Sequence, residues 1–127
     1  MSDIPEDLCY TEEHEWVRLE GDEVIVGITD HAQDALTDIV YVELPDVGMS
    51  VNVGDEFASV ESVKSVSSIF APLAGELSAV NESLDEAPEL MNDDPYGTGW
   101  MVRIRIENNG VLSDLLDAAG YRALLGE

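Results

Sequence analysis

The chain has 127 residues, of which 28 are acidic and 5 are basic, and its formal net charge is −23. This length fits one domain with its own hydrophobic core, and a hydrophobic content of 45% argues against a disordered chain. The charge disfavours binding to nucleic acid or to anionic membranes, because phosphate groups are bound by clustered Lys and Arg.

No segment of the chain predicts export or insertion into a membrane. No apolar run approaches the ~20 residues that span a bilayer, and the N-terminal residues have neither the basic nor the apolar region of a signal peptide. The single cysteine, Cys9, rules out an internal disulfide and fits a reducing compartment. We therefore expect a cytoplasmic protein.

The acidic residues are spread along the chain, with 10 in positions 1–30 and 6 in each of the stretches 31–60, 61–90 and 91–127. An even spread is typical of a solvated acidic surface rather than of an acidic tail. Self-repulsion of such a surface is relieved by salt, so we interpret the charge as adaptation to a high-salt cytoplasm. The alternative is an ordinary acidic protein that docks on basic partners.

Short apolar or alternating runs, separated by Gly, Pro, Asn and Asp, predict a series of strands. The predicted strands are 16–20, 24–28, 39–44, 56–62, 65–70, 76–80 and 100–106. The first two flank Gly21 and Asp22 and are expected to form a hairpin. Alternation in the last strand predicts two faces, with Val102, Ile104 and Ile106 on one and Met101, Arg103 and Arg105 on the other.

Helical segments are predicted near both ends. Thr29 has the features of an N-cap, before a short helix that ends at about Leu36. The tail after Gly110 is predicted to be helical, continuing through 121–125, with one apolar face made by Leu112, Leu115, Leu116 and Ala119. Residues 81–99 are predicted to form a loop with one helical turn near Glu89. The whole chain, 1–127, therefore predicts a single mainly β domain, a small β-sandwich with short helices near its start and at its end.

Lys64 is the only lysine in the chain, and it stands between two predicted strands. The chain should reverse at Val63 and Lys64, so the ammonium group is expected to point into water. A solvated turn lysine is the ordinary interpretation of such a residue.

The residues around Lys64 favour another interpretation. They are Gly48, Val51, Gly54 and Asp55, then the run 60–64, then Ala71, Pro72 and Gly75. This pattern resembles the lipoyl and biotinyl carrier domains, in which a tight hairpin presents one lysine to a modifying enzyme. Biotin carriers usually place methionine on both sides of that lysine, whereas Val63 and Ser65 stand here, which favours lipoate.

Further segments narrow the resemblance. They are 14–17, 27–34, 42–45, 60–64, 95–96 and 99–101, in that order. Together they resemble the glycine cleavage system H-protein family over about residues 10–125, which implies a lipoyl-type β-sandwich, the barrel-sandwich hybrid fold. Two residues depart from the family pattern: Ser65 stands where Ala is usual, and Ser68 stands where Asp is common.

The resemblance implies a non-enzymatic carrier with lipoate joined to Lys64 by an amide bond. The lipoyl arm would take the methylamine group of glycine from glycine decarboxylase to an aminomethyltransferase, and dihydrolipoamide dehydrogenase would reoxidise it. A lipoate-attaching enzyme would be a further partner. The alternative is a lipoyl carrier or relay protein that serves another lipoate-dependent system.

The resemblance also associates Glu15 with a cleft that holds the loaded arm. A carboxylate there could pair with the cationic amine through a charge-assisted hydrogen bond. The alternative for Glu15 is a solvated surface glutamate beside Glu12 and Glu13. His31 could line the same cleft or have a structural role, and Trp16 is expected in the core or the cleft wall.

Two other classes of site are weakly supported. Cys9 with His14 or His31 could form a thiol–imidazole pair of an enzyme, but such a pair needs a meeting in space that spacing cannot show. The two histidines and nearby carboxylates have no recognised metal-ligand spacing, so no metal site is predicted.

Overall fold

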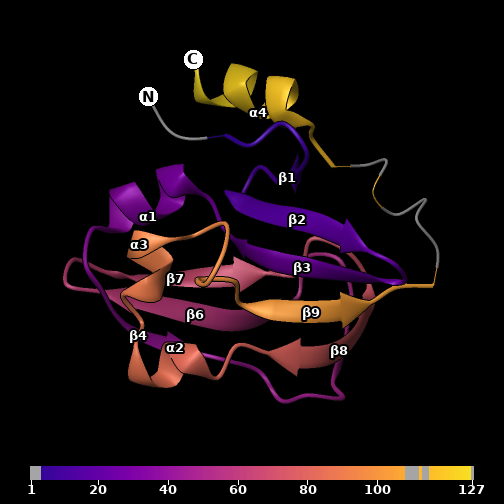
Figure 1. Cartoon of the computed structure of the whole chain (residues 1–127), viewed down its shortest axis with the longest axis horizontal. Helices are drawn as coiled ribbons and strands as arrows, with labels where there is room; N and C mark the ends of the chain where they lie inside the picture. The colour runs from indigo at the N-terminus through magenta and orange to yellow at the C-terminus, as the bar shows by residue number, and fades with distance from the viewer. Residues whose placement is uncertain (1–3, 108–111, 113–114, 127) are drawn as a thin grey trace.

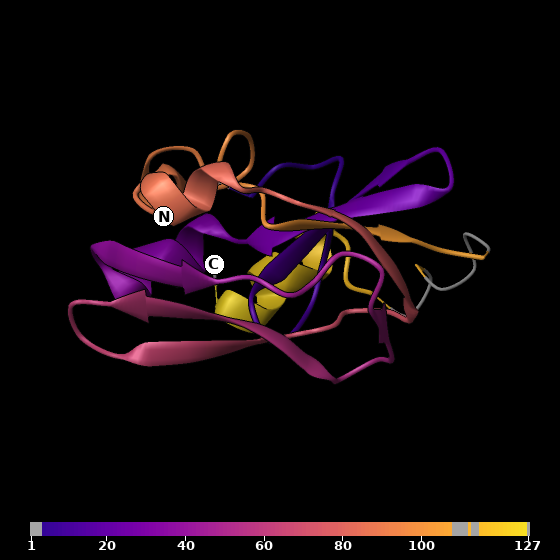
Figure 2. The ribbon, with the colours of Figure 1, turned by 90° about the horizontal axis from the view of Figure 1, so that it is seen from below.

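The structure is a computed structural model that describes residues 4–107, 112 and 115–126. Within these residues the strands form two antiparallel sheets (Figures 1 and 2). The six-stranded sheet has the order β1 (Cys9–Tyr10), β2 (Glu15–Glu20), β3 (Glu23–Ile28), β9 (Val102–Arg105), β8 (Gly75–Val80), β5 (Ser50–Val51). The three-stranded sheet has the order β4 (Ile39–Glu43), β6 (Glu56–Ser62), β7 (Val66–Phe70). The predicted mainly β sandwich is confirmed.

Four short helices complete the described part of the chain. They are α1 (Asp30–Leu36), α2 (Ser83–Glu86), α3 (Leu90–Asp93) and α4 (Ala118–Leu125). The prediction for α1 is confirmed, since the side chain of Thr29 caps it by accepting a hydrogen bond from the Ala32 amide. None of the helices described is long and apolar enough to cross a membrane.

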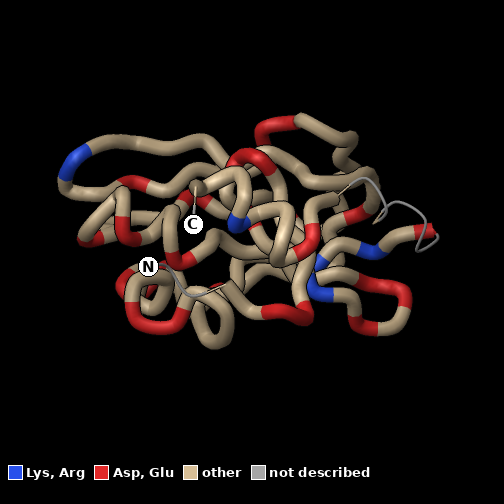
Figure 3. Tube along the Cα trace, turned by 90° about the horizontal axis from the view of Figure 1, so that it is seen from above, with Lys and Arg blue, Asp and Glu red and all other residues tan. Residues whose placement is uncertain are grey.

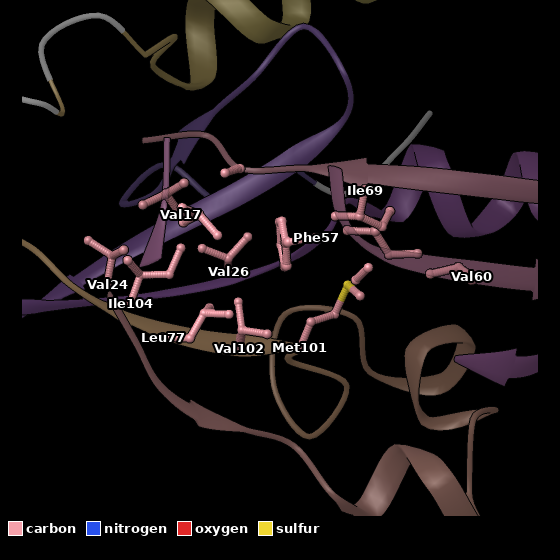
Figure 4. Packing of buried hydrophobic residues seen from close by; sticks show 14 of the residues in the cluster. Val17, Val24, Val26, Phe57, Val60, Ile69, Leu77, Met101, Val102 and Ile104 are labelled. Carbon is pink, nitrogen blue, oxygen red and sulfur yellow. The ribbon is translucent and has the colours of Figure 1, made fainter. Parts of the chain in front are cut away.

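The core lies between the two sheets. Val17 and Val26 point inward from the six-stranded sheet, and Phe57 and Ile69 point inward from the three-stranded sheet (Figure 4). All four side chains are buried. Full burial of a side chain of this size stabilises a fold by about 1.5–3 kcal/mol, so this layer fixes how the two sheets face each other.

Met101 corrects one prediction of side-chain direction. The alternation of 100–106 was expected to turn Met101 away from the core, but its side chain is fully buried and joins the core cluster (Figure 4). Strand β9 begins only at Val102, so the alternation of a strand does not extend to Met101. Val102, Ile104 and Ile106 are buried as predicted.

The tail before α4 corrects a second prediction. Leu116 is extended and forms a β-bridge with Tyr10, with N···O distances of 2.7 and 2.8 Å in the two directions. Asp117 then caps α4 by accepting a hydrogen bond from the Gly120 amide, so the helix cannot include Leu115 or Leu116. The predicted helical face was therefore wrong for these two leucines, and its expected start after Gly110 lies outside the described residues. The prediction failed because it rested only on the spacing of apolar residues three and four positions apart, which is typical of a helix.

Candidate functional site

Lys64 lies in the turn between β6 and β7. Ser62 shapes this turn, because its side-chain oxygen lies 3.2 Å from the backbone nitrogens of both Lys64 and Ser65, and its amide donates to the Ser65 carbonyl at 2.8 Å. The Lys64 side chain is exposed. The β6–β7 hairpin reaches out at one end of the molecule (Figure 2). The predicted reversal of the chain at an exposed lysine is confirmed.

The Lys64 ammonium group has no ion pair among the residues that the structure describes. The other basic side chains are held by neighbours. Arg103 and Arg105 pair with Glu20, Glu23 and Glu76, Arg122 pairs with Glu6, and Arg18 donates to the Tyr96 carbonyl. Asp and Glu residues are spread over the whole trace (Figure 3), but no ion pair joins a described one to the Lys64 ammonium group. The amine is therefore open to a modifying enzyme.

Apolar residues flank Lys64 at the tip. Val63 is 65% exposed and Val66 is 62% exposed. The Val63 amide donates to the Asp38 carbonyl at 3.1 Å, which ties the tip to the segment after α1. The backbone of the tip is thus fixed, while its side chains face solvent.

A cleft of about 390 Å³ lies at the other end of β7. It is bounded by the loop that leads into β2, by residues 70–74 and by the segment before α4. Its lining residues are Tyr10, Thr11, Glu12, Glu13, Glu15, Val53, Gly54, Phe70, Ala71, Pro72, Leu73, Ala74, Leu115 and Leu116. Most of these side chains are apolar, and the charged ones all come from the 12–15 segment.

Glu15 forms part of this cleft wall and is only 1% exposed. Its Oε2 accepts a hydrogen bond from the Phe70 amide at 2.8 Å, and its Oε1 lies 3.2 Å from the Thr11 hydroxyl. The alternative of a solvated surface glutamate was therefore wrong. Burial of a carboxyl group is costly unless such donors are present, which makes Glu15 unlike the exposed carboxylates around it.

Burial is the main influence on the acidity of Glu15. It raises the pKa of this carboxyl group to about 7, against the lowering effect of the Phe70 amide and the Thr11 hydroxyl, and the charge of Glu13 raises it further. Both protonation states are therefore accessible at neutral pH. A cation that enters the cleft would favour the charged state.

His31 is not among the residues that line this cleft. Its ring contacts the ring of His14 in a tilted arrangement, with centroids 4.7 Å apart and an interplanar angle of 42°. His14 Nδ1 lies 2.8 Å from the Tyr121 hydroxyl, which lies 2.8 Å from the Thr29 hydroxyl. Burial and His31 lower the pKa of His14. The two histidines thus lie together where α1, α4 and the loop before β2 meet, and His14 is hydrogen-bonded there.

Cys9 does not show the features of a reactive thiol. It lies in β1 opposite Val17 of β2. Burial and the charge of Asp117 raise its pKa, whereas a nucleophilic thiol needs a lowered one. Within the described residues, no group of three or more His, Cys, Asp or Glu side chains could hold a metal ion.

The two groups that donate to Glu15 were not predicted from the sequence. Thr11 could have been found, because a threonine placed just before a polar turn often accepts a hydrogen bond from an amide two residues on. The Phe70 amide could not, because it comes from a strand 55 residues further along the chain. Trp16 is fully buried as expected, and its Nε1 donates to the Pro95 carbonyl at 2.8 Å.

Known proteins resemble this chain over nearly its whole length. A family model described as glycine cleavage H-protein matches residues 8–127. The glycine cleavage system H protein of Photorhabdus laumondii is 56% identical over 128 residues, which covers 100% of this chain and 98% of that protein. A protein of the same name from Thermus thermophilus is 57% identical over 123 residues, covering 97% and 96%. A crystal structure of a glycine cleavage system H protein from Mycobacterium marinum matches with a TM-score of 0.89 at 38% identity, covering 98% and 100%.

Proposed function

Because the chain belongs to the glycine cleavage H-protein family, we propose that its lipoyl group is attached to Lys64. The chain is a lipoyl carrier of the glycine cleavage system, and it passes the methylamine group of glycine from the decarboxylase to the aminomethyltransferase. One observation carries the assignment to Lys64: the only lysine of the chain is exposed at a hairpin tip and has no ion pair among the described residues.

The residues present fit a lipoyl arm. Lys64 offers an accessible amine, and β7 begins beside the Lys64 turn and ends at the cleft, so one strand connects the two places. The cleft walls suit an aliphatic chain, with Pro72, Leu73 and Leu115 among them. The buried carboxyl group of Glu15 suits a cationic end on that chain.

The lipoyl group, once attached, supplies a disulfide that can accept the aminomethyl group. The protein's residues hold and shield this cargo. Glu15 pairs with its ammonium group, the Phe70 amide and the Thr11 hydroxyl hold the carboxylate in place, and the apolar walls exclude water. No residue here needs to break a bond, so we propose that the chain is a non-enzymatic carrier.

The carrier works with the other components of the glycine cleavage system. We propose that these partners are the glycine decarboxylase, the aminomethyltransferase, dihydrolipoamide dehydrogenase and a lipoate-attaching enzyme. Residues 1–127 would act as a single lipoyl-carrier domain in the cytoplasm. Tethering the reactive sulfurs to the carrier raises their local concentration at each partner.

Attachment is tested by intact-mass analysis after incubation with a lipoate ligase, lipoate and ATP. A bacterial H protein known to accept lipoate is the positive control for the ligase. We expect one lipoyl group, located by peptide mapping to the peptide that contains Lys64. A biotin adduct, lipoyl mass on another peptide, or no lipoyl mass when the control is fully modified would overturn the assignment. A glycine–CO2 exchange assay with glycine decarboxylase then tests the pathway.

A further inference from the structure

The Thr11 hydroxyl makes three contacts at the base of the cleft. Its oxygen lies 3.2 Å from the backbone nitrogen of Glu13, 3.2 Å from the backbone nitrogen of Glu15, and 3.2 Å from Oε1 of the Glu15 carboxyl group. A hydroxyl group has two lone pairs and one hydrogen. Both amides are donors, so they occupy the two lone pairs. The hydroxyl hydrogen must then point at Glu15 Oε1.

The second oxygen of Glu15 is also fixed as an acceptor. The Phe70 amide donates to Oε2 at 2.8 Å, and an amide cannot accept a proton in return. Neither of these neighbours can therefore take a hydrogen from a protonated Glu15. Each carboxyl oxygen keeps one further lone pair, and Glu15 lines the cleft. A proton on Glu15 therefore occupies one of these two remaining lone pairs.

We propose that Thr11 is a positioning residue for Glu15, which directs the cleft-side lone pairs of this carboxyl group to hold either a proton or a primary ammonium group. The second half of this statement rests on the function proposed above, in which the cleft receives an aminomethyl cargo. Binding the ammonium group then expels a proton from Glu15, and release of the cargo takes a proton back.

Few other charges act on this exchange. Glu12 and Glu13 line the cleft from the same loop, and both favour a cation. The other lining segments are Val53–Gly54, 70–74 and Leu115–Leu116, and they contribute no charged side chain. Glu15 is the buried member of the acidic set, so it is the group whose protonation the cargo controls.

The first test titrates Glu15 in the chain without lipoate, by NMR of its carboxyl carbon. Thr11→Val removes the hydroxyl group at nearly constant shape, and Thr11→Ser retains it. We expect the Glu15 midpoint to move up by about one pH unit in Thr11→Val, because a donor to the charged form is lost, and to stay near the wild-type value in Thr11→Ser. Equal midpoints in all three proteins would overturn the positioning role.

A measurement on the wild-type chain keeps the test decisive if Thr11→Val does not fold. The side-chain carbon shifts of Thr11 should titrate with the same midpoint as the Glu15 carboxyl carbon, because the hydroxyl hydrogen bond follows that charge. Thr11 shifts that stay constant through the Glu15 transition would overturn the proposal. Neither titration needs a group on Lys64, so both stand apart from the test of attachment.

The cargo half is tested with the lipoylated, aminomethyl-loaded chain. The rate of amine release into water is measured against pH in the wild type, Thr11→Val and Thr11→Ser. We expect the midpoint of the release profile to move with the Glu15 midpoint found in the first test. A release profile that is the same in all three, while the Glu15 midpoint differs, would overturn the exchange of a proton for the ammonium group.

Discussion

Ser62 at the exposed turn and Thr11 at the cleft use the same local contact. Each side-chain oxygen accepts from two backbone amides that follow it in the chain, at 3.2 Å in all four cases. The two residues differ in the third contact of the hydroxyl group. Ser62 lies 3.2 Å from the Ser65 carbonyl, whereas Thr11 lies 3.2 Å from the Glu15 carboxyl group.

Because of this difference, Ser62 shapes only the backbone of a turn, whereas Thr11 also acts on the ionisation of a carboxyl group. At the tip, the Ser62 contacts fix the turn and leave the Lys64 side chain in solvent. At the cleft, the Thr11 contacts act on a carboxyl group that is 1% exposed and has a pKa of about 7. Burial, rather than the local contact, decides whether the same arrangement changes the chemistry of a neighbouring side chain.

The largest effect should come from breaking the exposed site. Lys64→Arg retains a positive charge but offers no free amine for acylation, because arginine stays protonated. With no other lysine in the chain, we expect no lipoylation and no activity in glycine–CO2 exchange. The free energy of unfolding should change by no more than ~0.5 kcal/mol, since the substitution is at an exposed turn.

Mass spectrometry, the exchange assay and denaturant melts of the two unmodified proteins measure these three outcomes. A folded Lys64→Arg protein that still supports exchange would contradict the carrier assignment. A strongly destabilised one would show that Lys64 has a structural role at the tip.

Added salt should act strongly on the exposed charges and only weakly on the buried carboxyl group of Glu15. Screening shortens the Debye length from ~10 Å at 0.1 M to ~3 Å at 1 M salt, which removes most repulsion on a surface of net charge −23. We expect the melting temperature to rise steeply with KCl, and the Glu15 midpoint to move little. A melting temperature that is flat between low and molar KCl would contradict the high-salt interpretation of the composition.

Glu15→Gln should change how stability depends on pH. The pKa of Glu15 rises from 4.5 to about 7 on folding, so the folded state holds a proton that the unfolded state releases. The contribution of this group to the free energy of unfolding is therefore fully present below pH 4.5, and it is lost as the pH rises through about 7. The loss is roughly 3 kcal/mol, at about 1.4 kcal/mol for each unit of pKa.

Denaturant melts of wild type and Glu15→Gln at about pH 4.5 and about pH 8 measure this loss. The free energy of unfolding of the variant minus that of the wild type should increase by roughly 3 kcal/mol from the lower pH to the higher one. The loaded arm of Glu15→Gln should also lose its amine to water faster than that of the wild type. A constant stability difference and an unchanged release rate would remove Glu15 from the proposed site.

Tyr121→Phe should weaken the frame around the cleft by about 1–3 kcal/mol, because buried hydrogen-bond partners lose the hydroxyl group. These partners are His14 and Thr29, which belong to the loop before β2 and to the N-cap of α1. Thermal melts measure the loss. Tyr10→Phe is the matched control, since its hydroxyl group donates to the carbonyl of Pro5, a partly buried residue, whereas Thr29 is fully buried. A larger loss in the control would contradict the role given to Tyr121.

Ser62→Ala should have the smallest effect. The amides of Lys64 and Ser65 lose their acceptor, but both residues are exposed and water can replace it. We expect a loss of less than ~1 kcal/mol and a slower, still complete lipoylation. Initial rates of lipoylation and thermal melts measure these outcomes. Abolished lipoylation would mean that the lipoate-attaching enzyme needs this turn geometry strictly.

The sequence was sufficient for the exposed site because the features there are local. Two alternating runs and the residues between them predict the Lys64 turn without any knowledge of distant contacts. The burial of Glu15 could not be predicted in this way, since it depends on the Phe70 amide and on Leu115 and Leu116.

Leu115 and Leu116 show the same limit of prediction from the sequence. Their spacing is typical of a helix, but Leu116 pairs with Tyr10 in a β-bridge, and α4 begins only at Ala118. Met101 likewise follows the core rather than the alternation of the strand that begins after it. Tertiary contacts determined the conformation or burial of each residue for which the sequence pattern gave a wrong prediction.

The bridge between Tyr10 and Leu116 also sets an order of events during synthesis of the chain. The contacts that shape the lysine turn lie within residues 38–66, so they are available once the middle of the chain has left the ribosome. The cleft lacks part of its wall until Leu115 and Leu116 have emerged. A nascent chain therefore contains every partner of the lysine turn before it contains the whole wall of the cleft for the aminomethyl cargo.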